Sequence, residues 1–206
     1  MATLAQLRSR IADDLDRDDM STQIDKAVNR AISHYGMSRF WFNEATGTFS
    51  TVASQENYGT GDGIPSDILE VDYLTVTSGS DKLEVEQRDY KFLQQINPDA
   101  GTGLPIYFAW FQENIYFYPV PDAVYTITVS YLQNYSDLSA DGDSNDFSNN
   151  ADELIENYSL RWIYSRVLKD PEQALIANQL EQSAFSSLQA KTTNLISDGS
   201  LRPTEF

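Results

Sequence analysis

Residues 103–135, GLPIYFAWFQENIYFYPVPDAVYTITVSYLQNY, carry the strongest fold signal in the sequence. They include ten aromatic residues, out of 12 Tyr, 10 Phe and 3 Trp in the whole chain. From Tyr125 to Tyr131 bulky side chains alternate with Thr and Ser, and this period of two is typical of a half-buried antiparallel strand. Two aromatic-rich runs, residues 105–111 and 115–119, precede it and are separated by a short polar turn. The stretch therefore predicts a three-stranded meander at the centre of a small sheet.

Two amphipathic helices are predicted before the β-rich part of the chain. Thr3 and Gln6 have the spacing of a capping box, which begins the first helix. The second helix begins at Ser21 or Thr22 and ends near Gly36. The apolar positions of both recur at helical spacing, and they are Leu4, Leu7, Ile11 and Leu15, then Ile24, Ala27, Val28, Ala31, Ile32 and Tyr35.

Two further helices are predicted after the β-rich part. One starts near Asp152. The dipeptide Asp170-Pro171 gives the other helix an N-cap and a first-turn proline, and this helix runs to about Ala190. Its apolar stripe is expected to be Leu180, Ala184 and Leu188.

The order of these segments predicts an α+β protein. Residues 1–42 and 151–191 are expected to form a four-helix bundle, because each helix has one apolar face to bury. Residues 43–150 are then an inserted antiparallel β-rich region with one short helix at 87–96. Residues 192–206 lose the helical pattern and predict an extended or disordered C-terminal tail.

Composition excludes several classes of protein. The 206 residues include no cysteine, so disulfides and thiolate metal sites cannot form. We expect synthesis in a cytoplasm and no membrane partner, because the N-terminus does not resemble a signal peptide and no run approaches about 20 apolar residues. The net charge of −17 disfavours a protein that grips nucleic acid, because its surface repels phosphate.

An acidic loop offers a candidate metal site. Asp141, Asp143 and Asn145 have the one-three-five spacing of a calcium loop, and Asp152 falls at position twelve. The loop departs from that pattern at position six, where Asp146 replaces glycine, and at position twelve, where a bidentate Glu is usual. The alternative is a solvated loop whose Asx side chains bond their own backbone. We expect no cofactor.

No catalytic signature is present. His34 is the single histidine, and the sequence contains no nucleophile elbow. The glycine-rich residues 59–63 lack the Lys-Ser/Thr of a phosphate-binding loop and predict a flexible loop instead. A structural or binding protein is therefore favoured over an enzyme such as a cell-wall hydrolase. The aromatic stretch is interpreted as a sheet packed on helices, with a protein interface as the alternative.

Several short patterns taken together point to one kind of protein. They are Asn29-Arg30-Ala31 followed by Arg39-Phe40-Trp41, Ile64-Pro65-Ser66-Asp67, Gly103-Leu104-Pro105 with Tyr107, the loop Pro119-Val120-Pro121-Asp122-Ala123, and Asp170-Pro171-Glu172. In this order the chain resembles the head–tail adaptor proteins (head-completion or connector proteins) of short-tailed bacteriophages. The resemblance covers nearly the whole chain.

The resemblance implies a structural virion protein of the neck. Such adaptors form a ring, commonly of about twelve copies, beneath the portal protein. The ring extends the channel used in DNA packaging and ejection, DNA passes without specific binding, and a tail nozzle or tail-fibre protein attaches below. Another phage neck or tail interaction module is the alternative. The C-terminal segment of such adaptors reaches the portal, and its candidate anchors here are Leu195, Ile196, Leu201 and Phe206.

Overall fold

The computed structural model describes residues 2–96 and 101–196. The chain is α+β and divides into two compact units. The helical unit comprises Met1–Asn43 and Tyr135–Phe206, and the β unit comprises Glu44–Asn134. Each unit has its own cluster of buried apolar side chains.

The helical unit contains five α-helices and one π-helical turn within the described residues. They are α1 (Leu4–Leu15), α2 (Ser21–Tyr35), α4 (Asp146–Asn150), α5 (Asp152–Ile163), the π-helical turn η2 (Tyr164–Leu168) and α6 (Pro171–Ile196). The capping box at Thr3 and Gln6 is confirmed. The predicted cap of α2 is wrong, because the N-cap is Met20 and makes no side-chain hydrogen bond.

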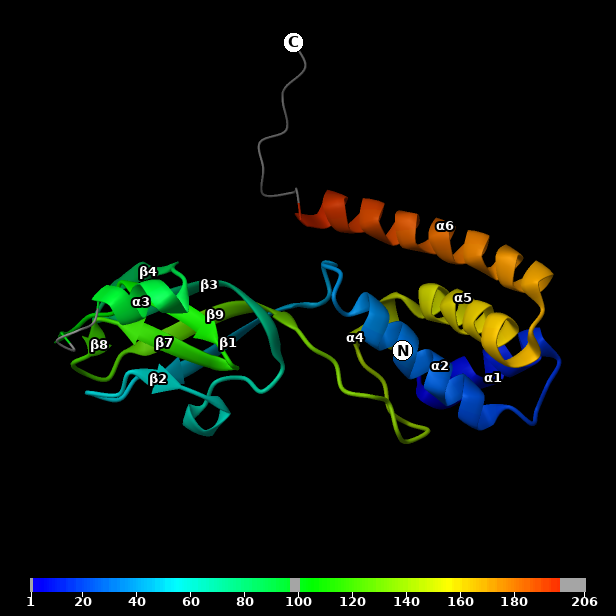
Figure 1. Cartoon of the computed structure of the whole chain (residues 1–206), viewed down its shortest axis with the longest axis horizontal. Helices are drawn as coiled ribbons and strands as arrows, with labels where there is room; N and C mark the ends of the chain where they lie inside the picture. Colours follow the sequence, from blue (N-terminus) through cyan, green and yellow to red (C-terminus); the bar gives the residue numbers. More distant parts are fainter. Residues whose placement is uncertain (1, 97–100, 197–206) are drawn as a thin grey trace, which may run out of the picture. The chain divides into compact units, whose positions relative to one another are not determined.

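Helix α5 is central to the packing of the helical unit. It packs against α1, α2 and α6, and Figure 1 shows it between α2 and α6. The main contacts of α6 are with α5, so a closed four-helix bundle is not confirmed. Fully buried side chains from α1, α2 and α5 fill the centre, together with Phe40 and Phe147, whose rings lie 5.7 Å apart edge to face.

Residues 135–150 belong with the helices, which corrects the predicted boundary of the insertion at residue 150. Leu138 and Phe147 are buried in the helical core. Asn29 on α2 holds the backbone of Leu138 at both its N–H and its C=O, at 2.8 and 2.9 Å. Phe147 is a single large apolar residue in a polar run, so its burial draws the run onto the helices and places α4 there.

The β unit is built on a seven-stranded sheet of order β1-β9-β3-β4-β6-β7-β2. Its strands are β1 (Glu44–Ser50), β2 (Asn57–Tyr58), β3 (Ile68–Ser78), β4 (Asp81–Gln87), β6 (Tyr107–Phe111), β7 (Asn114–Tyr118) and β9 (Thr126–Gln133). A second small sheet joins β5 (Thr102–Gly103) to β8 (Val120–Pro121), and the short helices are η1 (Thr60–Asp62) and α3 (Tyr90–Ile96).

The predicted three-stranded meander is wrong in its third strand. The hairpin β6–β7 forms as expected, but β9 pairs with β1 and β3 instead of β7. Strand β9 lies inside the sheet, and its residues 129–132 are all buried. A central strand of this kind needs partners on both sides, and β1 and β3 supply them.

The expectation of a flexible loop at residues 59–63 also needs correction on its N-terminal side. Tyr58 directly precedes these residues and is fully buried. Its hydroxyl donates to the carbonyl oxygens of Val52 and Gln55 and accepts from the N–H of Val52, at 2.9 to 3.1 Å. The side chain of Asp62 accepts from the N–H of Gly59 at 2.9 Å, so the turn that follows is held as well.

Candidate interaction surfaces

Helix α6 contacts the rest of the helical unit through one narrow stripe. The N-cap prediction is confirmed, because Asp170 Oδ1 accepts from the N–H groups of Glu172 and Gln173 at 3.1 Å. The predicted stripe is wrong at Leu180, which is exposed. The buried positions are mostly small and recur every three or four residues, at Ala177, Glu181, Ala184, Leu188 and Thr192.

One charged residue occupies the middle of this stripe. Glu181 is only 5% exposed, and its carboxylate accepts a hydrogen bond from the hydroxyl of Tyr35 at 2.5 Å. Arg161 donates two hydrogen bonds to the same carboxylate, one of them at 3.2 Å. Burial, together with the bond to Glu181, raises the pKa of Tyr35 above its ordinary value. The bond to Glu181 likewise raises the pKa of Arg161.

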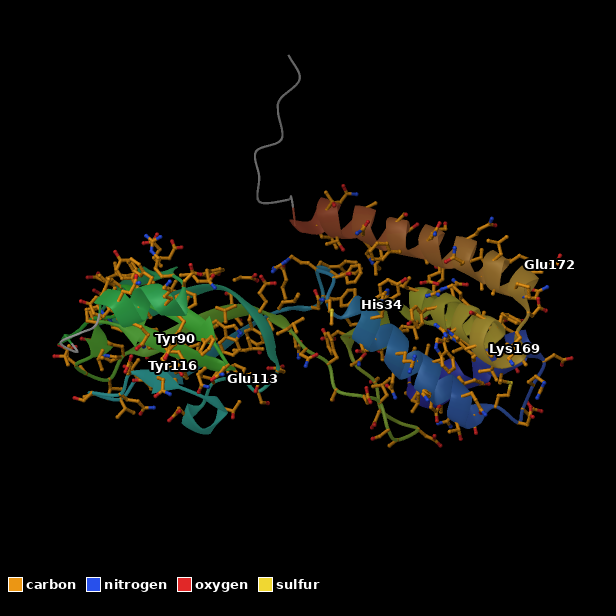
Figure 2. All side chains as sticks on the ribbon, viewed as in Figure 1. His34, Tyr90, Glu113, Tyr116, Lys169 and Glu172 are labelled. Atoms are coloured by element: carbon orange, nitrogen blue, oxygen red, sulfur yellow. The ribbon has the colours of Figure 1, made fainter. Side chains whose placement is uncertain are left out.

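His34 lies beside this network. Its ring is 4.8 Å from Tyr35 and 5.4 Å from Tyr158, measured between centroids, and the guanidinium of Arg161 lies 4.8 Å from the ring of Tyr158. Figure 2 labels His34 near the C-terminal end of α2. His34 is exposed, so it lies at the surface against these aromatic rings. The sequence did not single out Glu181, although a Glu at a buried helical position is the signal that could have identified this network.

The C-terminal end of α6 exposes the first of the four predicted tail anchors. Leu195 follows Thr192 by three residues and so continues the buried stripe, yet it is 48% exposed. Four residues before Leu195, the ammonium of Lys191 lies 4.3 Å from the ring centroid of Trp41. Ile196 is the last residue of α6. Leu201 and Phe206 lie outside the described residues. The helix thus runs beyond the predicted end at Ala190.

The four candidate calcium ligands each have a structural partner. Asp141 accepts from Arg8, and Asp152 accepts from Arg10. Asn145 caps α4 by accepting from Ser148 N. Asp143 Oδ2 accepts from the N–H groups of residues 139 and 140, at 2.8 and 2.7 Å, and these bonds lower the pKa of its carboxyl group.

The described ranges contain no group of three or more His, Cys, Asp or Glu side chains placed to hold a metal ion. The structure therefore disperses the four acidic-loop residues into separate capping and ion-pair contacts.

The aromatic residues of the hairpin β6–β7 pack against α3. The rings of Tyr90 and Phe111 stack with centroids 4.4 Å apart, and Tyr116 lies 4.7 Å from Tyr90. Figure 2 labels Tyr90 and Tyr116 side by side. On the same helix Phe92 contacts Tyr107 edge to face at 5.8 Å. Three aromatic residues of the hairpin, Tyr107, Phe111 and Tyr116, therefore hold α3 on the sheet, whereas Phe108 and Phe117 are buried in the core of the β unit.

No helix in residues 2–96 and 101–196 combines the length and apolar character needed to cross a membrane. No curated protein matches the chain. Residues 2–203 do match the family model described as SU10 adaptor protein. This match covers nearly the whole chain and confirms the resemblance to phage head–tail adaptors. The chain therefore belongs to the SU10 adaptor protein family, whose members are structural components of phage particles.

Proposed function

We propose that copies of this chain form a closed ring, of about twelve subunits, beneath the portal of a phage capsid. The ring extends the channel for DNA packaging and ejection and is the platform for a tail nozzle or tail-fibre protein. The observation that carries the proposal is the family match over residues 2–203. Adaptors of this kind are structural, and we assign the chain no catalytic step.

The charge of the chain supports a channel that DNA passes without specific binding. With 31 acidic and 14 basic residues, the chain has a formal net charge of −17. A surface of this sign repels the phosphate backbone, so DNA meets no adhesive contact as it slides. The protein is made in the host cytoplasm and acts at the virion neck.

The C-terminal segment docks on the portal. Leu195 supports this step, because it continues the buried stripe of α6 to a position where no described residue buries it. Ile196, Leu201 and Phe206 follow in sequence and supply further apolar side chains. Apolar side chains carried on a short terminal segment suit docking in a hydrophobic groove of a partner.

The molar mass of the protein in solution tests whether its copies form a ring. Light scattering on the chain alone, then on its mixture with the portal protein from the same genome, should show adaptor copies joining the portal as one ring. A chain that ignores the portal but binds another neck or tail protein would support the alternative of a different neck or tail interaction module. A chain that binds none of these proteins would contradict the proposal.

Leu195 provides a sharper test of the docking segment. Leu195→Asp should weaken binding to the portal about tenfold, because it replaces an apolar anchor with a charge. Ile106→Asp is the matched control, because Ile106 is also 48% exposed. Deleting residues 197–206 leaves α6 intact and tests Leu201 and Phe206 together. Equal portal binding by the wild type, Leu195→Asp and the shortened chain would contradict the assignment of this segment.

A further inference from the structure

The outward surface of α6 carries no charge over most of its length. Glu181 is the one charged residue within residues 173–190, and it is buried. In the whole chain 22% of residues are charged, and the outer face of a surface helix is normally where they gather. The other polar side chains exposed along this stretch are Gln173, Gln179, Gln182, Ser183, Ser186, Ser187 and Gln189.

The N-terminal half of this surface is also apolar. Leu175, Ile176 and Leu180 are 60%, 48% and 53% exposed, although each is large enough to be a core residue. Ile176 and Leu180 are four residues apart and therefore lie on one line of the helix. We call the exposed side chains of residues 173–190 the neutral face of α6.

A groove opens beside Leu175. It holds about 520 Å³ and lies between the start of α6 and the end of α5 with η2. Ala174, Leu175 and Asn178 line it from α6, and Arg161, Ser165 and Lys169 line it from the other side. Figure 2 labels Lys169 and Glu172 at this turn. The groove is shallow and open to solvent, and only its α6 side belongs to the neutral face.

The charge of the chain indicates what covers this face. Two copies that each carry a net charge of −17 repel one another. Burying an unpaired carboxylate between them costs roughly several kcal/mol of binding free energy. Copies can meet closely where the surface holds Leu, Ile, Gln and Ser and no carboxylate. A nucleic acid or another polyanion would instead need a basic surface, and residues 173–190 hold no Lys or Arg. The nearby basic residues, Arg161 and Lys169, line only the groove at one end of the face.

We propose that the neutral face of α6 is the surface through which one copy contacts the next copy of this chain in the ring. The inference rests on the proposed function, which requires a ring of identical subunits. In such a ring the contact is head to tail, so the neutral face of one copy meets a different surface of its neighbour.

Two substitutions place charge on the face without touching the core. In the double variant Ile176→Asp with Leu180→Asp, both sites are about half exposed, so the fold should persist with unchanged helical circular dichroism. Leu83→Asp with Val52→Asp is the matched control, because these residues are 47% and 53% exposed in the β unit. Light scattering with the portal should show ring yield reduced about tenfold for the α6 variant alone, and partly restored by salt because salt screens the repulsion.

Thiol labelling gives a second readout that leaves assembly undisturbed. The chain has no cysteine, so Leu180→Cys and Leu83→Cys each create a single reporter. Maleimide should label Leu180→Cys about tenfold more slowly in the ring than in the free chain, whereas Leu83→Cys should keep its rate in both states. Suppose that the wild type forms rings, that the α6 variant assembles equally well, and that Leu180→Cys is not protected from labelling. This result would overturn the inference about α6 but leave the proposed ring intact. A wild type that forms no ring would contradict the proposed function, and the inference with it.

Discussion

Glu181 connects three helices of the helical unit through one buried carboxylate. It lies on α6, and its partners are Tyr35 on α2 and Arg161 on α5. A buried ion pair is weak evidence for stability, because the desolvation of the charges offsets their attraction. Removing one partner is different, since the other partner then keeps its charge without compensation. The network therefore links α6 to two helices, in addition to apolar contacts such as the rings of Phe185 and Tyr35, 5.3 Å apart.

Glu181→Gln should lower the free energy of unfolding of the helical unit by about 1–3 kcal/mol, because Arg161 and Tyr35 lose an ionised acceptor. Thermal unfolding followed by helical circular dichroism measures the change. Glu172→Gln is the control, because this exposed carboxylate on the same helix should alter stability by less than about 0.5 kcal/mol. Equal effects of the two variants would show that the Glu181 network does not hold α6.

The hydroxyl of Tyr131 should make the β unit sensitive to alkaline pH. Burial and its hydrogen bond to Asp67, at 3.0 Å, raise the pKa of Tyr131 to about 12. In the unfolded chain the Tyr131 hydroxyl has the ordinary tyrosine pKa of about 10. Because the folded pKa is the higher one, the stability contributed by Tyr131 is complete below pH 10 and is lost as the pH rises toward about 12.

Denaturant unfolding at a series of alkaline pH values measures this loss. Tyr131→Phe should flatten the decline, and Tyr73→Phe, which alters an exposed tyrosine on β3, should not. An unchanged decline in Tyr131→Phe would assign the alkaline sensitivity to another group.

At the scale of elements, the turn between β6 and β7 has an unusual sequence for its backbone. Gln112 and Glu113 both have positive φ, at 50° and 59°. A two-residue hairpin turn with this geometry favours Asn-Gly, because other residues are strained there. Gln112→Asn with Glu113→Gly should therefore raise the free energy of unfolding of the β unit by about 0.5–2 kcal/mol.

The comparison variant for this turn is Glu113→Ala, which removes the same side chain but keeps a Cβ. It should not stabilise the β unit, because the strain at positive φ remains. Chemical denaturation of the three proteins measures the difference. Stabilisation by Ala equal to that by Gly would show that loss of the Glu side chain, not relief of backbone strain, is responsible.

Sequence predicted elements well where the signal was local. Thr3 with Gln6, and Asp170 with Pro171, marked helix starts, because a cap involves residues only three positions apart. The partner of β9 was not predictable in this way. Its alternating residues specify a strand but do not say which strand lies beside it, and β1 is more than seventy residues away in the chain. The same limit applies to Phe147, whose polar surroundings indicated a solvated loop.

At the scale of the whole molecule, the spacing of apolar residues in the sequence pointed to one candidate surface and missed the other. Leu195 was named from sequence as a candidate anchor, because it is an apolar residue in a polar segment, and that role stays a prediction. The neutral face of α6 was missed, because Leu180 was assigned to the buried stripe. A shift of one helical position separates a buried residue from an exposed one. Only the packing of α6 on α5 shows which side of the helix is outward.

The pairing of β1 with β9 makes the β unit separable from the helices. Glu44 pairs with Leu132 at one end and Ser50 with Thr126 at the other, so the chain enters and leaves the unit at adjacent positions. Neighbouring strands lie about 5 Å apart, and a linker of about four Gly and Ser residues spans that distance. Each unit also has its own buried apolar cluster. Two separately folding pieces are therefore expected.

Residues 44–134 expressed alone should unfold cooperatively. A linker variant replaces residues 44–134 with a Gly-Ser linker. It should keep its helical circular dichroism and its Leu195-dependent binding to the portal. A linker that replaces residues 43–150 is the contrasting variant. It also removes Leu138 and Phe147 from the helical core, so we expect it to lose several kcal/mol, roughly, and to unfold. If the second variant were as stable as the first, residues 135–150 would not be part of the helical unit.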